Sequence, residues 1–160
     1  MEGTMIAANI MRKEVITLGM DGKALDALKL IRDERIGLIP VVDRERKVLG
    51  VITPRGLMNA ILPGHGTDGL LEDVRSAPDL PKFIENIEAL AAKGIGEVLD
   101  KDYASVSPET SAMEAAALFV KAKSPHESIL VLDHRKRLLG TISPGDLFRM
   151  VLEFDERKNR

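Results

Sequence analysis

The chain has 160 residues and a mass of 17.5 kDa, enough for one ordinary domain or for two very small ones that share a core. It is 44% hydrophobic and 30% charged, as globular proteins are, and its 23 basic and 25 acidic residues leave a net charge of −2. That balance argues against nucleic acid as a partner, because domains that bind phosphate backbones carry a clear basic excess. The lack of cysteine excludes disulfides, thiolate catalysis and cysteine-ligated metal sites.

The first half of the chain predicts the order β-α-β-β-α. A short strand is expected over 14–18, and Asp21 is expected to cap a helix whose apolar residues recur at helical spacing. An apolar strand over 38–42, a polar turn from Asp43 and a second strand over 48–52 predict a hairpin. Thr53 and Pro54 then give the hydroxyl N-cap and first-turn proline that typically begin a helix.

A segment rich in glycine and proline, residues 62–81, separates the two halves and predicts an irregular loop. Leu70, Leu71 and Val74 are spaced for one helical turn within it. Residues 81–93 follow with apolar side chains on one side, which predicts an amphipathic helix with Gly94 as its C-cap. We interpret its apolar stripe, from Phe83 to Leu90, as core or as a dimer seam.

The second half predicts the same elements in the same order. A strand over 104–107 precedes a helix that Ser111 and Glu114 begin with a capping box. Strands over 128–132 and 138–142 form the hairpin, and Ser143-Pro144 begins the last helix. The final residues, 153–160, are highly charged and are expected to fray.

The two halves are an internal repeat, since a shift of 90 residues aligns 15–58 with 105–148 without a gap. Identity at ten positions exceeds the about three that typical residue frequencies give by chance. The identical pairs are Ala27/Ala117, Leu28/Leu118, Ile39/Ile129, Val41/Val131, Asp43/Asp133, Leu49/Leu139, Gly50/Gly140, Ile52/Ile142, Pro54/Pro144 and Leu57/Leu147. Neither unit alone buries much surface, so we expect the units to pair face to face.

The paired unit resembles the CBS domain family, named after cystathionine β-synthase. The resemblance rests on LDALKLIRDERIGLIPVVD and VLGVITPRGLMNAIL in the first unit, on MEAAALFVKAKSPHESILVLD and LLGTISPGDLFRMVL in the second, and on the lead-ins 9–13 and 97–101. It implies an α/β (α+β) fold of tandem β-α-β-β-α repeats packed about a pseudo-two-fold axis into a Bateman module. We therefore divide the chain into a first repeat (5–62), a loop and helix insert (63–94), a second repeat (95–152) and a charged tail (153–160).

The resemblance implies a regulatory module that binds an adenosine ligand (AMP, ADP, ATP or S-adenosylmethionine) and signals to a protein partner that the sequence does not name. The family signature is Gly, an apolar pair, Ser or Thr, two variable residues and Asp. The second unit matches it from Gly140 to Asp146, with Thr141 as a mildly polar exception in the apolar pair. Ser143 and the helix N-terminus suit a phosphate, and Asp146 suits the ribose hydroxyls. With no tryptophan and one tyrosine, aliphatic side chains would flank the adenine. The candidate ligand residues are Ser143, Asp146, Ile142, Pro144, Ile129, Val131, Ser107, Thr53 and Arg55.

The first unit departs from the signature, because Gly56 stands where the second unit has Asp146. Arg55 is still placed to meet a phosphate there, but we expect the second site to bind and the first to bind weakly or not at all. Near the second site, Glu127 follows His126 where some nucleotide-binding relatives have basic residues. It would repel a polyphosphate, which favours a singly phosphorylated or cationic ligand over ATP.

Two alternatives stay open at this stage. Ser143 and Asp146 also form a capping box that stabilises a helix without any ligand, and Thr53 is equally suited to be only an N-cap. The module would then be a ligand-free CBS-type dimerisation or adaptor module. A homodimer is expected in either case.

No enzyme activity, metal or required cofactor is expected, because the sequence has no nucleophile–base pair or glycine-rich phosphate loop and its three histidines are scattered. The longest apolar run, Ala115–Val120, is far shorter than the ~18–20 residues of a membrane span. The N-terminus has an early acid, Glu2, and an apolar stretch broken at Asn9, so no secretory signal is expected. These features predict a cytoplasmic protein that does not associate with membranes.

Overall fold

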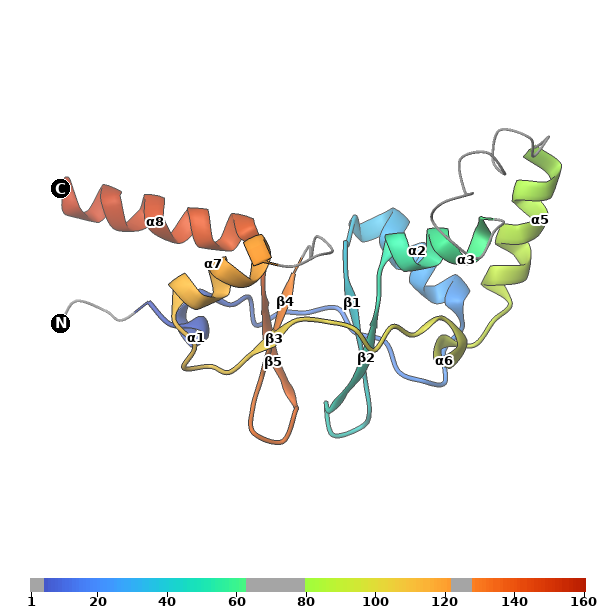
Figure 1. The fold of residues 1–160 in the computed structure, drawn as a ribbon, viewed down its shortest axis with the longest axis horizontal. Coiled ribbons are helices and arrows are strands. Elements are labelled where there is room, and N and C mark those ends of the chain that lie inside the picture. Colours follow the sequence, from blue (N-terminus) through green and yellow to red (C-terminus); the bar gives the residue numbers. More distant parts are fainter. Residues whose placement is uncertain (1–4, 63–79, 122–127) are drawn as a thin grey trace.

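The fold consists of two similar halves that lie side by side, each with a twisted β-hairpin and helices at one end (Figure 1). It is seen in a computed structural model, which describes residues 5–62, 80–121 and 128–160. The first half contains α2 (Ala24–Glu34), β1 (Ile39–Val42), β2 (Val48–Ile52), α3 (Pro54–Ile61) and α5 (Leu80–Ala91). The second contains β3 (Ser105–Val106), α7 (Ala112–Lys121), β4 (Ile129–Leu132), β5 (Leu138–Ile142) and α8 (Pro144–Lys158), and two short helices are α1 (Ala7–Ile10) and α6 (Ile95–Val98).

The two hairpins match each other in detail, which confirms the internal repeat in three dimensions. Both are antiparallel, Ile39 pairs with Ile52 as Ile129 pairs with Ile142, and both registers shift one residue before the strand ends. In the first turn, Asp43 Oδ1 accepts hydrogen bonds from two backbone N–H groups, each at 2.9 Å. Asp133 repeats this in the second turn at 2.8 and 2.9 Å. The side chain of each aspartate therefore stabilises its own turn by hydrogen bonds to the turn backbone.

The first strand of each repeat is weaker than predicted. In the first half it is reduced to a single bridge between Leu18 and Val41, and in the second it is β3, parallel to β4. The Asp21 cap is wrong: Lys23 holds the N-cap position of α2, and its backbone N–H donates to Asp26 Oδ2 at 2.8 Å. An acidic residue in the first turn thus satisfies the exposed N–H in place of an N-cap side chain.

Each short lead-in helix packs on the opposite repeat. Ala7 and Ile10 of α1 are buried in the core of the second half, and Ile95 of α6 is buried in the core of the first. Beyond α1, Arg12 forms a backbone bridge with Thr141 of β5, at 2.9 and 3.0 Å. Beyond α6, the Asp100 backbone bridges β2 in the same way. Each lead-in therefore crosses to the opposite half and completes the core of that half.

Two glycines permit this exchange. A Cβ atom at Gly140 would lie 2.5 Å from the Arg12 carbonyl oxygen, and one at Gly50 would lie 2.7 Å from the Asp100 carbonyl oxygen. Both distances are too short for real Cβ contacts, and backbone atoms do not yield easily. The identity of Gly50 and Gly140 in the repeat is thus explained by close backbone approach.

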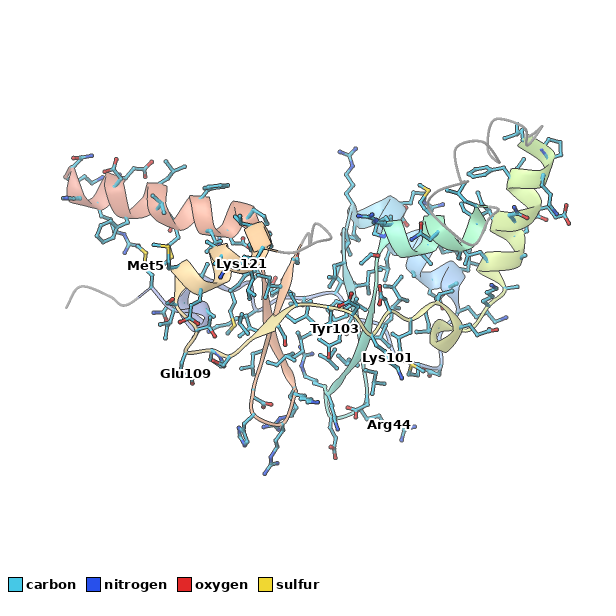
Figure 2. All side chains as sticks on the ribbon, in the orientation of Figure 1. Met5, Arg44, Lys101, Tyr103, Glu109 and Lys121 are labelled. Atoms are coloured by element: carbon cyan, nitrogen blue, oxygen red, sulfur yellow. The ribbon has the colours of Figure 1, made fainter. Side chains whose placement is uncertain are left out.

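The halves also meet directly through their hairpins. An apolar cluster lies between the two halves, and Tyr103 packs against it (Figure 2). Its members are Val48, Val51, Leu130, Leu132 and Leu138. Near the turns, backbone N–H groups of β2 and β5 donate to carbonyl oxygens of the opposite turn at 3.0 and 2.9 Å. The face-to-face packing expected from the repeat is present, as apolar contact supplemented by backbone hydrogen bonds.

The insert helix exists close to its predicted bounds, as α5, and packs against α2 and α3. Leu90 is 2% exposed and Ile87 packs on the same core, so this face of the predicted stripe is core. Gly94 is not its C-cap but begins α6, where its N–H donates to Glu97 at 2.8 Å. The predicted turn at Leu70, Leu71 and Val74 lies outside the described residues.

The charged tail is helical rather than frayed, since α8 extends to Lys158. Arg149 lies 3.9 Å from Glu153 one turn on, and Arg157 and Lys158 occupy the last turn, where cations complement the helix dipole. Within the described ranges, no helix has both the length and the hydropathy that a membrane span requires.

Replacing Gly140 with alanine should destabilise the protein by about 1–3 kcal/mol, because the new methyl group forces the Arg12 backbone away from β5. Urea denaturation measures this loss. Gly145→Ala is the matched control, since its nearest atom is Ser143 Oγ at 3.7 Å and alanine favours the first turn of α8. Equal stability of the two variants would contradict the close-approach argument.

Candidate functional site

The start of α8 places the two central candidates against each other, as the signature predicts. Ser143 is the N-cap, Pro144 is the first helical residue, and Asp146 occupies the third helical position. The Ser143 N–H and hydroxyl each donate to Asp146 Oδ2 at 2.9 Å, and the Asp146 N–H donates back to Ser143 Oγ at 3.3 Å. The capping box is therefore complete in both directions.

Asp146 is the one buried charged side chain in the described part of the chain, with 1% of its surface exposed. Its second oxygen, Oδ1, accepts a hydrogen bond from Arg12 Nε at 2.7 Å and lies 3.5 Å from an Arg149 nitrogen. Arg12 comes from the exchanged N-terminal lead-in, 134 positions away. The carboxylate thus joins the start of α8, the lead-in and the second turn of α8.

The environment of Asp146 favours its ionised form. Burial acts to raise the pKa of this carboxyl, but the hydrogen bond from Arg12 and those from the Ser143 N–H and hydroxyl outweigh burial. The pKa therefore lies below the usual range for aspartate, and the group is a carboxylate at neutral pH. An ionised carboxylate is the kind of acceptor that a vicinal diol requires.

Neither Arg12 nor Arg149 was among the residues selected from the sequence. Arg12 lay in a lead-in assigned to the first repeat, and only the exchange of lead-ins places it beside Asp146 of the second. The signal that could have found Arg149 is its position three residues after Asp146, which puts the two on one helix face.

The equivalent place in the first repeat has a different charge pattern. Thr53 caps α3 and its hydroxyl accepts the Gly56 N–H at 3.0 Å, while Arg55 is exposed on the first turn. Because Asp100 bridges Val51 as Arg12 bridges Thr141, Asp100 stands where the second repeat has Arg12. The first repeat lacks both members of the Arg12–Asp146 ion pair, with glycine in place of the carboxylate and an acid in place of the guanidinium.

The aliphatic candidates are part of the core. Ile129, Val131 and Ile142 have 0% of their surface exposed and pack among α1, α7 and α8. A role for them beside an adenine ring stays a prediction, and in this structure their side chains contact other core residues.

Ser107 lies in a more open setting, at the end of β3. Its N–H donates to Thr110 Oγ1 at 3.2 Å, and the two hydroxyls are 3.1 Å apart. Hollows of about 610 and 460 Å³ lie along β3, and Ser105, Val106 and Ser107 line both. Ser107, a candidate from the sequence, thus lines a concave surface. The other candidates, Ser143 and Asp146, line neither of these two hollows.

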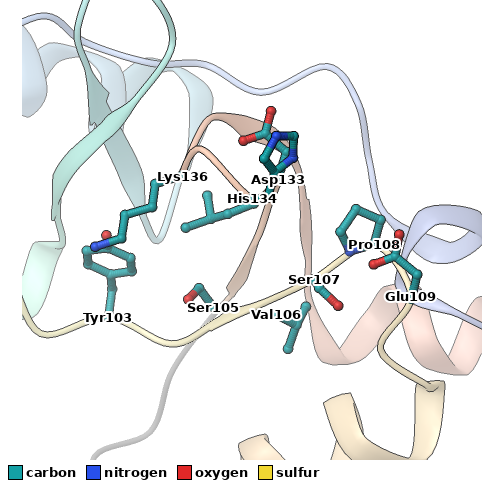
Figure 3. Close-up of a pocket in the computed structure, with 10 residues that line it drawn as sticks. Tyr103, Ser105, Val106, Ser107, Pro108, Glu109, Asp133, His134 and Lys136 are labelled. Atoms are coloured by element: carbon teal, nitrogen blue, oxygen red, sulfur yellow. The ribbon is translucent and has the colours of Figure 1, made fainter.

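The larger hollow is lined in part by residues of the second hairpin turn. Figure 3 shows Lys136 extending from the second hairpin turn toward Tyr103, with His134 and Asp133 nearby. Lys136 adopts a positive φ of 62°, which turns the chain at this point. The hollow has the volume of a small-molecule site, and its polar groups carry both charges. His126 and Glu127, the other residues considered for phosphate, lie outside the described residues.

No group of three or more histidines or carboxylates in the described ranges is arranged to hold a metal ion.

Comparison with known proteins assigns the family. The family model described as "CBS domain" matches the chain twice, over residues 7–63 and 95–153. The chain belongs to the CBS domain family. Its two CBS repeats cover the capping box, the exchanged lead-ins and both hairpins.

Relatives of this CBS pair span nearly its whole length. Uncharacterized protein MJ1426 of Methanocaldococcus jannaschii is 23% identical over 92% of this chain and 92% of its own. The solved structure of the CBS-pair protein CBSX2 from Arabidopsis thaliana has a TM-score of 0.73 at 17% identity, covering 96% of this chain and 99% of that one. A structure of CBSX2 in complex with AMP has a TM-score of 0.70 at 19% identity, covering 94% and 98%. These likenesses show the tandem-repeat fold.

Replacing Asp146 with asparagine should reduce stability at pH 7, and the reduction should disappear in acid. Because the folded-state pKa is lowered, the carboxylate stabilises the fold above the unfolded-state pKa, near ~4, and this contribution is lost as pH falls through the lower folded-state pKa. Urea denaturation between pH 7 and pH 2.5 measures the gap between the two proteins. A gap that stays constant down to the lowest pH would contradict this assignment.

Proposed function

We propose that this CBS pair is a regulatory module that binds an adenosine ligand at the start of α8 in the second repeat and signals its presence to a protein partner. The observation that carries the proposal is the buried, ionised Asp146 beside Ser143 at a helix N-terminus. The likeness to CBSX2, solved in complex with AMP, supports the ligand class.

The site offers separate groups for the ribose and for the phosphate of the ligand. Asp146 offers a carboxylate to the ribose hydroxyls, as acidic residues do in other nucleotide sites. The N-terminus of α8 favours a phosphate through the positive end of the helix dipole. Two guanidinium groups, Arg12 and Arg149, lie around the carboxylate. They favour an anionic ligand such as AMP over the cationic S-adenosylmethionine.

The second repeat is the better binding site of the two. The first repeat has Thr53 as an N-cap and Arg55 on the surface, but Gly56 provides no carboxylate for a ribose. We therefore propose one principal site in each chain. A cytoplasmic location and the identity of the regulated partner stay predictions.

A homodimer through the second repeat is part of the proposal, and the internal repeat gives the reason. In the first repeat, α5 packs on α2 and α3, and Ile61 is 7% exposed. The equivalent residue in the second repeat, Val151, is 58% exposed, and the described residues show no helix in the place of α5. The apolar face of α7 and α8 consists of Met113, Val120, Phe148, Val151 and Leu152.

A second copy of this chain fits that face. Along α8, Arg149 precedes Glu153, Asp155 and Glu156, so an antiparallel α8 of a second copy would set the arginine of each chain opposite the acidic residues of the other. Contact between like faces would then bury the apolar residues on both copies.

The runner-up function is a ligand-free dimerisation or adaptor module. The completed capping box and the exposed α7/α8 face favour it, since both exist without a ligand. The insert is less suited to be its seam, because Ile87 and Leu90 of α5 face the first-repeat core. Only Phe83 and Ile84, 39% and 46% exposed, are left on the outer side of that stripe.

A thermal-shift panel with AMP, ADP, ATP and S-adenosylmethionine tests the ligand proposal. A ligand at 100 times its Kd should stabilise the fold by about 2.7 kcal/mol, or several degrees in Tm, with AMP the strongest. Asp146→Ala should abolish the shift, and Asp21→Ala, at an exposed aspartate of the first repeat, should preserve it. If no ligand shifts the Tm of the wild-type protein, the adaptor function is the better account.

Sedimentation analysis tests the dimer. The wild-type protein should sediment at twice its mass of 17.5 kDa, and Val151→Glu should sediment as a monomer, because two buried carboxylates would face each other. Met58→Glu, the equivalent of position 148 in the first repeat, is the control and should remain dimeric. A wild-type monomer, or dissociation by Met58→Glu alone, would refute this interface.

A further inference from the structure

The candidate ribose acceptor is already hydrogen-bonded at both of its oxygens within the chain. Oδ2 of Asp146 takes both donors of Ser143 at 2.9 Å, and Oδ1 takes Arg12 Nε at 2.7 Å. With 1% of the side chain exposed, a ribose hydroxyl reaches this carboxylate only if one of these donors leaves.

Arg12 is the donor that can leave. The Ser143 contacts close the N-terminus of α8, so their loss would uncap the helix. The Arg12 side chain, in contrast, is 62% exposed, and its backbone is held separately by the two hydrogen bonds to Thr141. The guanidinium can therefore rotate away from Oδ1 while the lead-in stays paired with β5.

The displaced guanidinium then needs another anion. An unphosphorylated nucleoside is neutral, so its hydroxyls would replace the ion pair by hydrogen bonds from uncharged donors and leave Arg12 with water alone. A nucleotide brings its own anion, and a guanidinium pairs with phosphate through two parallel N–H···O hydrogen bonds. The exchange of partners then conserves the ionic contact.

We propose that Arg12 determines the specificity of the second-repeat site by covering Asp146 in the free protein and pairing with the ligand phosphate in the bound one. This inference rests on the proposed function, since it requires an adenosine ligand at Asp146. Arg12 is a positioning residue that sets ligand selectivity. It lowers the affinity for ligands without a phosphate and raises the affinity for ligands that have one. Arg149, whose nitrogen lies 3.5 Å from the same oxygen, stays to balance the carboxylate.

The first repeat supports the link between the Arg12 guanidinium and the Asp146 carboxylate. There Gly56 replaces the carboxylate and Asp100 occupies the bridge position of Arg12, and its own Oδ1 accepts the Asp102 N–H at 2.8 Å. The covering cation is absent where there is no carboxylate to cover. The position-12 arginine therefore belongs with the ligand carboxylate and not with the lead-in exchange, which both repeats retain.

Isothermal titration of AMP and of adenosine into the full chain tests the inference. The wild-type protein should prefer AMP by about ten-fold or more, a difference typical of a charge-assisted phosphate contact. In Arg12→Gln, adenosine should bind several-fold tighter than in the wild type, AMP should bind more weakly, and the preference should fall about ten-fold. Arg12→Lys should keep part of the preference, because lysine supplies the charge without the paired donors.

Arg32→Gln is the matched control, since it also removes an exposed arginine that pairs with an aspartate, at 2.6 Å from Asp33. It should leave both affinities unchanged. Circular dichroism of each variant verifies the fold. An unchanged AMP-to-adenosine ratio in folded Arg12→Gln, with AMP still bound, overturns the role of Arg12 and leaves the proposed function intact. If neither compound binds the folded wild-type protein or Arg12→Gln, the proposed function fails, and the inference fails with it.

Discussion

The structure depends on the pairing of each lead-in with the hairpin of the opposite repeat. The Arg12 backbone bonds Thr141 and the Asp100 backbone bonds Val51, and glycine at positions 140 and 50 leaves room for both. Because α1 and α6, which directly precede these contacts, lie in the opposite cores, the two halves are joined by backbone hydrogen bonds and by buried side chains at both ends. The same crossing carries Arg12 to Asp146, so the architecture and the candidate site share one cause.

Duplication has produced two similar frames with different chemistry. The hairpins, their aspartate turns and the hydroxyl-capped helices are alike, but only the second repeat combines a buried carboxylate with a guanidinium from the lead-in. The outer faces differ as well, since α5 covers the first repeat and the equivalent apolar face of the second is exposed. The outer face of the first repeat is thus packed within the chain, whereas the second repeat has the buried carboxylate and an exposed apolar face.

The sequence predicted the elements with strong local signals. Both hairpin strands β2 and β5 have the expected bounds, and proline with a hydroxyl N-cap located the starts of α3 and α8. The reciprocal contact of Ser143 and Asp146 also follows from local spacing. Predictions failed where the competing signal was weak or distant. Asp26 rather than Asp21 accepts the N–H at the start of α2, and the tail continues α8 with one i,i+4 charge pair and two cations in its last turn.

The partner of Asp146 was beyond local reasoning, because no periodicity within either repeat indicates that lead-ins exchange. Arg12 is 134 positions from its carboxylate and its role depends on tertiary topology alone. The burial of Ile129, Val131 and Ile142 has the same origin: alternation marks a strand as apolar, but α1 from the other end of the chain closes the core over them. Family membership, by contrast, was apparent from the ordered set of motifs and is confirmed by the two matches.

The exchange of α1 and α6 also sets the order in which this chain matures. During synthesis from the N-terminus, residues 7–10 wait for a core that is not complete until β5 has emerged, and the first core waits for Ile95. Contacts so distant in sequence are formed late, because closing a long loop costs entropy before any contact repays it. Neither half therefore completes its core alone, because the second core needs residues 7–10 and the first core needs Ile95.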